Sequence, residues 1–186
     1  MYLPSVKKII KLIDGINEMV GRAVSWLTLL LVLVVCLEVV RRTFFNTTSI
    51  WSMELQWHMF SLIFLLGAGY ALKHDRHVRV DLFYTNFSKR DQAWVNLFGS
   101  ILLLMPWLLV TIYFSFFYAL DSWHLGEGSP DPGGLPARYL IKFAVPVGLS
   151  FLLLQAISIT LSSLLILKET AVETSFRNND LIDSEL

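Results

Sequence analysis

The sequence has little charge and almost no cysteine, and both shortages limit what the protein can be. Only 16% of its 186 residues are charged, whereas 55% are hydrophobic and the mean hydropathy is +0.59. A soluble domain of this length needs more charge on its surface, so the composition predicts an integral membrane protein. The formal net charge is zero, which leaves no excess of cations for phosphate contacts and argues against a nucleic-acid partner.

The single cysteine, Cys36, excludes an internal disulfide and, with it, a membrane thiol oxidoreductase that needs paired cysteines. It lies among Leu and Val, where a cysteine usually acts as a small hydrophobic residue. The sequence also has no HExxH or CxxC pattern, no glycine-rich phosphate loop and no nucleophile with an evident base. We therefore expect no catalytic, metal or cofactor site in this chain, and we predict that the protein is not an enzyme.

What the sequence does have is long apolar stretches, and these predict an all-α membrane protein with four transmembrane helices. An amphipathic helix over residues 1–22 precedes the transmembrane domain, and a polar cytoplasmic tail over 168–186 follows it. The transmembrane domain covers residues 23–167, with spans at about 23–40, 51–72, 94–120 and 143–167.

The N-terminal helix has apolar residues at three- and four-residue spacing, and its opposite side is charged. Such a helix can lie among the headgroups with its lysines toward anionic phospholipid, or it can extend the first span. The sequence leaves both arrangements open.

Local signals refine the later helices. Ser88 resembles an N-cap and predicts that the third helix starts there. Pro106 predicts a kink near the middle of that helix, and Pro146 falls in the first turn of the fourth span, where proline is tolerated. One stripe of the fourth span has the pattern that is typical of hydrogen bonding between membrane helices, and it comprises Gly148, Gln155, Ser158 and Ser162.

The orientation follows from the basic residues. Most Lys and Arg residues occur before the first span, in the connector after the second span and in the tail. The positive-inside rule then predicts that both termini lie in the cytoplasm and that the Gly/Pro-rich loop over 121–142 faces the outside.

Polar and small residues in the spans are candidates for contacts with other helices. Glu38 precedes Arg42 by one helical turn, which predicts either a local ion pair or a contact of Glu38 with a partner. Gly67 and Ala71 form a small-xxx-small step that lets a helix approach closely. Trp107 lies near the membrane midplane, where it faces either lipid or protein.

Two histidines leave open a freestanding four-helix membrane protein, such as a b-type cytochrome or a small exporter. His58 and His124 are the one pair placed to ligate a haem. A cytochrome normally holds its ligands deeper in the membrane, and the nearly apolar midplane offers no transport path. Four spans without a pore favour an accessory subunit.

The chain resembles the small membrane subunit (the DctQ-like, or Q, subunit) of tripartite ATP-independent periplasmic transporters. The resemblance covers about residues 23–167. It is carried by an Arg pair after the first span, the entry Trp51-Ser-Met-Glu54-Leu, the stretch Phe64-Leu-Leu-Gly67-Ala-Gly-Tyr-Ala71-Leu and the stretch His77-Val-Arg-Val-Asp81-Leu, with weaker support from Gly134-Leu-Pro136 and Pro146-Val-Gly148.

The resemblance implies a multi-pass protein of the bacterial inner membrane that forms a heterodimer with a larger membrane subunit. In this family the larger subunit holds the substrate and sodium sites. A periplasmic binding protein captures the substrate, commonly an organic acid such as a dicarboxylate or sialic acid, and docks on the outer face. The small subunit is thought to hold the scaffold still while the larger one moves.

The site residues that we expect from this resemblance are hypotheses about assembly. Arg41 or Arg42 pairs with Glu54, or each is solvated among headgroups, and Arg79 and Asp81 fix the cytoplasmic connector. The expected interface with the large subunit comprises Arg41, Arg42, Glu54, His58, Gly67, Ala71, Arg79, Asp81 and Trp107. The expected docking site of the binding protein comprises Asp121, Glu127, Asp131 and Arg138.

Overall fold

The computed structural model describes residues 3–74, 84 and 86–184, with side chains from residue 4 to 169, and no strand occurs in these ranges. The helices are α1 (Leu3–Phe45), α2 (Ile50–Lys73), α4 (Lys89–Phe98), the π-helix η1 (Gly99–Leu104), α5 (Met105–His124) and α6 (Tyr139–Ser184). Four helical stretches are long and apolar enough to span a membrane, namely Pro4–Phe45, Ile50–Lys73, Lys89–His124 and Tyr139–Glu169. The predicted all-α fold is therefore confirmed, with four helices long and apolar enough to span a membrane.

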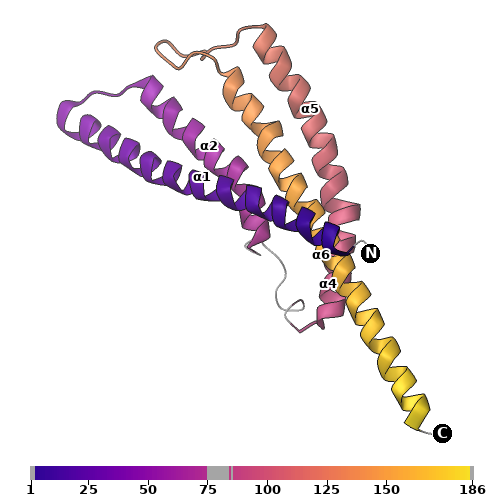
Figure 1. Cartoon of the computed structure of the whole chain (residues 1–186). Helices are drawn as coiled ribbons and strands as arrows, with labels where there is room; N and C mark the ends of the chain where they lie inside the picture. Colours follow the sequence, from indigo (N-terminus) through magenta and orange to yellow (C-terminus); the bar gives the residue numbers. More distant parts are fainter. Residues whose placement is uncertain (1–2, 75–83, 85, 185–186) are drawn as a thin grey trace.

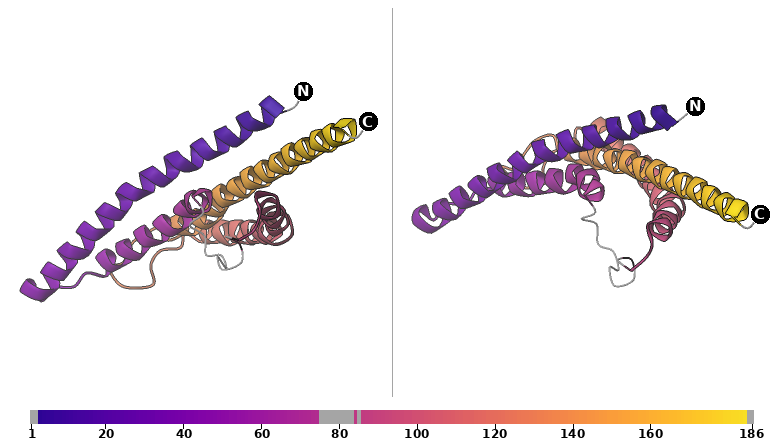
Figure 2. Two further views of the ribbon diagram at one scale, coloured as in Figure 1. Left: turned by 90° about the horizontal axis from the view of Figure 1, so that it is seen from below. Right: turned by 60° about the horizontal axis from the view of Figure 1, so that its bottom comes forward.

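The long helices form an open layer in the order α1, α2, α6, α5 (Figure 1). The central helices α2 and α6 pack on each other, while α1 and α5 lie on opposite sides of this pair (Figure 2). The links at 46–49 and 125–138 lie at one end, called here the loop end. The opposite end, where α2 finishes and α4 begins, is called the connector end.

Two glycines allow α2 and α6 to approach closely. A Cβ atom at Gly148 of α6 would lie 2.7 Å from the carbonyl oxygen of Leu65, and one at Gly69 of α2 would lie 3.0 Å from that of Phe151. Only glycine permits helix backbones to come this near. The contact fixes α2 and α6 side by side, both running from the loop end to the connector end.

The N-terminal segment is part of the layer. Helix α1 is continuous from Leu3, so the structure extends the first span toward the N-terminus without a break. Asp14 accepts hydrogen bonds from Ser158 Oγ at 2.7 Å and Gln155 Nε2 at 3.0 Å, and Asn17 Nδ2 donates to Gln155 Oε1 at 2.9 Å. The predicted interhelical bonding by Gln155 and Ser158 is confirmed, and its partners are polar residues of the amphipathic segment.

A second connection at the connector end joins α1 to α2. Lys73 Nζ lies 2.7 Å from Glu18 Oε2 and 3.1 Å from the Asp14 carbonyl oxygen. His74 Nε2 lies 3.0 Å from the same Glu18 oxygen. The acidic residues of the amphipathic segment thus bind other helices, whereas Lys7, Lys8 and Lys11 remain exposed.

The third and fourth helices differ partly from expectation. Ser88 caps α4 as predicted, because its Oγ accepts the Asp91 N–H at 3.2 Å. The irregularity near Pro106 is the π-helix η1, which contains Leu102, whose carbonyl the proline ring would crowd in a regular α-helix. Helix α6 begins at Tyr139, so the placement of Pro146 in the first turn is wrong and this proline lies inside the helix.

The close contact between α2 and α6 predicts opposite outcomes for two glycine-to-alanine changes. Gly148→Ala should lower the free energy of unfolding by about 1–3 kcal/mol, because the new methyl group overpacks the Leu65 carbonyl. Gly15→Ala should raise it by about 0.5–1 kcal/mol, because nothing lies within 4 Å and alanine favours the helix. Unfolding in detergent measures both, and equal shifts would contradict the proposed packing.

Candidate functional site

The loop between α5 and α6 is attached to α2 by one buried carboxylate. Glu54 is 6% exposed and lies in the second turn of α2. The Ser129 hydroxyl donates to its Oε1, and the Leu135 N–H donates to its Oε2 at 2.5 Å. A Cβ at Gly134 would lie 2.7 Å from Oε2, so glycine leaves the carboxylate room. We call Glu54, Ser129 and Leu135 the loop clamp.

A second carboxylate fixes the base of the same loop. Glu127 forms an ion pair with Lys142 of α6 and accepts a hydrogen bond from Ser122 Oγ of α5 at 2.6 Å. The Lys142 ammonium and the Ser122 hydroxyl hold the pKa of Glu127 below its usual value. Because the folded pKa is lowered, this stabilisation is present above the ordinary carboxyl pKa and is lost as pH falls through the folded value.

The four residues predicted to dock a binding protein fall into two groups, because two of them contact other residues of the chain and two are exposed. Glu127 is occupied by Lys142, and Arg138 lies over the Trp57 ring with 5.6 Å between its guanidinium carbon and the ring centroid. Asp121 and Asp131 are exposed. Two of the four residues therefore hold the loop, whereas Asp131 on the loop and Asp121 near the end of α5 present charge at the surface.

The structure does not pair Arg41 or Arg42 with Glu54. The loop covers Glu54, whose oxygens accept from Ser129 and Leu135. Arg41 Nη1 instead lies 3.7 Å from Glu38 Oε2, and Arg42 is exposed. The prediction that Glu38 pairs with Arg42 is also wrong, since the neighbouring arginine is the one within reach.

The two histidines considered for haem lie in different settings. His58 Nδ1 lies 2.6 Å from the Glu54 carbonyl oxygen, and its ring centroid is 3.9 Å from that of Trp57. His124 is exposed in the last turn of α5. A hydrogen bond from Nδ1 to a backbone carbonyl leaves Nε2 available, so this contact does not bear on the cytochrome alternative.

An apolar groove brings together three of the residues predicted to contact a partner. It has a volume of about 650 Å³ and lies where α2, α5 and α6 meet. Gly67 and Ala71 line it from α2, and Trp107, which is 69% exposed, lines it from α5. A Cβ at Gly67 would meet nothing closer than Val24 Cγ1 at 3.9 Å. Within the described residues, Gly67 of the small-xxx-small step therefore makes no close contact with another helix.

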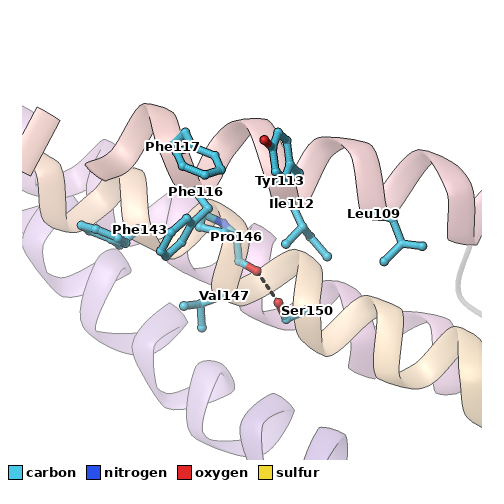
Figure 3. Close-up of a pocket in the computed structure, with 9 residues that line it drawn as sticks. All are labelled: Leu109, Ile112, Tyr113, Phe116, Phe117, Phe143, Pro146, Val147 and Ser150. Carbon is cyan, nitrogen blue, oxygen red and sulfur yellow. Dashed lines mark hydrogen bonds between the residues drawn. The ribbon is translucent and has the colours of Figure 1, made fainter. Parts of the chain in front are cut away.

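A second groove, of about 430 Å³, was not predicted from the sequence. Figure 3 shows it between α5 and α6, with Phe116 and Phe143 facing one another. Their ring centroids are 6.2 Å apart in an edge-to-face arrangement. The run of aromatic residues over 113–118 was the available signal, but an aromatic run alone does not show which helix packs beside it.

Arg79 and Asp81, predicted to fix the connector, lie outside the described residues. The polar network of Asp14 and Asn17 with α6 was not predicted as a set. The spacing of Gln155 and Ser158 indicated one half of it, but the other half lies about 140 residues away in the chain.

A comparison with known families finds a match over most of the chain. The DctQ family, described as "Tripartite ATP-independent periplasmic transporters, DctQ component", matches residues 31–165. The matched range contains the loop clamp and both grooves, whereas Asp14 and Asn17 lie before it. No curated protein matches the chain.

The loop clamp predicts the effect of replacing its carboxylate. Glu54→Gln leaves one acceptor where two are used, and a hydrogen bond to a charged group typically contributes about 1.5–3 kcal/mol. We expect hydrogen exchange of the Leu135 amide to speed up about tenfold or more. Glu169→Gln, a change at the opposite end, is the matched control. Unchanged exchange at Leu135 in the first variant would show that the clamp does not hold the loop.

Proposed function

Because the chain belongs to the DctQ family, the small membrane component of tripartite ATP-independent periplasmic transporters, we propose that it is the scaffold subunit of a sodium-driven importer of an organic acid. The family match over residues 31–165 is the observation that carries this proposal. The substrate is a dicarboxylate or a sialic-acid-like acid. The protein works with a large membrane subunit and a periplasmic substrate-binding protein.

The absence of a polar path through the described helices supports a scaffold role. A transport site needs several polar groups near the midplane, usually at broken helices. In the described part of the chain, the clustered polar side chains lie at the loop end and the connector end, and the groove over α2 is lined mainly by aliphatic and aromatic residues. We therefore assign the substrate and sodium sites to the large subunit.

The apolar groove is the proposed seat of a helix of the large subunit, with which the chain forms a heterodimer. Small residues on α2 leave room for a helix backbone, and Trp107 offers a large apolar surface beside them. The open layer supports this assignment, because α2 and α5 leave the groove uncovered by other helices of the described chain.

We propose that the loop end faces the periplasm and the connector end the cytoplasm of a bacterium, with the chain in the inner membrane. Exposed Lys7, Lys8, Lys11, Lys89 and Arg90 gather at the connector end, in agreement with the positive-inside rule. Asp121 and Asp131 then face the compartment in which a binding protein delivers substrate.

Filling the apolar groove should disrupt the heterodimer. Ala68 lines the groove and Ala23 is exposed on α1, so Ala68→Trp and Ala23→Trp add the same bulk at two places. We expect the first change to lower co-purification of the large subunit about tenfold, as for an interface weakened by about 1.4 kcal/mol. The second should leave it unchanged. Full recovery of the large subunit with the Ala68 variant would contradict the proposed seat.

The exposed aspartates should affect delivery of substrate. Replacing Asp121 and Asp131 together with Asn should lower uptake about threefold to tenfold when binding protein is limiting, because rim charges steer association. Uptake should recover when binding protein is in excess. Glu169→Gln, at the other end of the molecule, serves as the control. Equal uptake by the variant and the parent at limiting binding protein would count against docking at this loop.

A further inference from the structure

A small polar notch separates the end of α1 from the start of α2. Its volume is about 190 Å³, and it lies at the loop end of the molecule. Glu38 and Arg42 reach it from α1, Thr48 from the link between the helices, and Gln56 from α2, with Val35, Val39 and Met53 as its apolar wall. None of these residues belongs to the loop clamp or to the two larger grooves.

Two polar atoms in this notch are buried without a hydrogen-bond partner in the described chain. They are Glu38 Oε2, an acceptor, and Gln56 Nε2, a donor. The Glu38 side chain is 12% exposed, and Arg41 Nη1, at 3.7 Å from Oε2, is too far for a hydrogen bond. The Ser49 N–H reaches only the other carboxylate oxygen, at 3.4 Å. Neither atom has accessible surface of its own, so a ligand in the notch meets them only when the two side chains turn toward it. Because buried polar groups are normally satisfied, this pair favours such a turn toward a ligand with both a donor and an acceptor.

The notch lies at the depth of lipid headgroups. Exposed aromatic residues surround the same end of the hairpin, namely Phe44, Phe45, Trp51 and Trp57, and Trp is typical of the membrane interface. Further along α1 the exposed surface is aliphatic, with Val32 and Leu33 facing outward. A lipid bound here could place its headgroup in the notch and its acyl chains along α1.

Charge distinguishes a lipid from a protein side chain as the occupant. Arg42 stands at the notch, is exposed and has no ion pair among the described residues. An amide side chain of a partner could bond Glu38 and Gln56, but it would bring no anion for Arg42. A phosphate beside Arg42 and Gln56, together with an ammonium beside Glu38, complements all three groups.

We propose that this notch binds the headgroup of a phospholipid that carries a primary ammonium group. With the Glu38 and Gln56 side chains turned into the notch, the ammonium donates to Glu38 Oε2, and the phosphate accepts from Gln56 Nε2 and pairs with Arg42. The Thr48 hydroxyl provides a further donor to the phosphate. This assignment requires only that the chain lies in a membrane, and it does not depend on the proposed transport function.

Native mass spectrometry of the purified full chain tests the proposal with two lipids that have the same acyl chains. Phosphatidylethanolamine has a primary ammonium, whereas the trimethylated group of phosphatidylcholine cannot donate a hydrogen bond. We expect the protein to retain the former about tenfold better, the change that one charge-assisted hydrogen bond of ordinary strength produces. Glu38→Gln should reduce this preference to about onefold.

The second variant, Arg42→Gln, replaces an exposed side chain and so leaves the fold intact even if Glu38→Gln does not fold. It should lower retention of both lipids, whereas Arg90→Gln, an exposed change at the connector end, should alter neither. Equal retention of the two lipids by the parent protein, or a preference that survives Glu38→Gln in folded protein, would overturn the proposal. If the preference for phosphatidylethanolamine is lost only when the large subunit is present, a side chain of that subunit occupies the notch, and this result would also overturn the proposal.

Discussion

The close contact between α2 and α6 is the interaction on which the rest of the structure depends. Each of the other long helices packs against one or both of these two, and Gly148 and Gly69 allow their backbones to meet. In lipid, apolar side chains gain little by leaving one apolar surface for another, so close van der Waals contact and hydrogen bonds must hold the helices together. Gly148 and Gly69 meet the first requirement between α2 and α6, and Asn17, whose side chain lies against Gly69, meets the second through Gln155.

At the two ends of the layer, polar side chains hold the helices together through hydrogen bonds. At the connector end, Asp14 joins α1 to α6 through Gln155 and Ser158. At the loop end, Glu54 joins α2 to the loop that connects α5 and α6. A carboxylate near a membrane interface is tolerated when donors surround it, and each of these has at least two. Both carboxylates are therefore parts of the framework rather than candidates for chemistry.

This distribution explains why a chain with four spans suits an accessory role in the DctQ family. An open layer of helices, polar at its ends and apolar between them, has large lateral surfaces for another membrane protein and for lipid. The groove at Gly67 and Trp107 belongs to such a surface. The notch at Glu38 is lined by an acidic and a basic side chain, which complement a lipid headgroup rather than an acyl chain.

The sequence by itself determined the class of the protein, because apolar stretches long enough to cross a membrane leave the backbone no other regular structure than the helix. It also determined the Ser88 cap and the irregularity before Pro106, which depend on neighbouring residues alone. Only the tertiary structure decided that Glu54 holds a loop instead of pairing with Arg41, since Ser129 and Leu135 lie about 80 residues away. It likewise decided that the amphipathic segment joins the layer, because helical periodicity shows which residues share a face but not which helix will cover it.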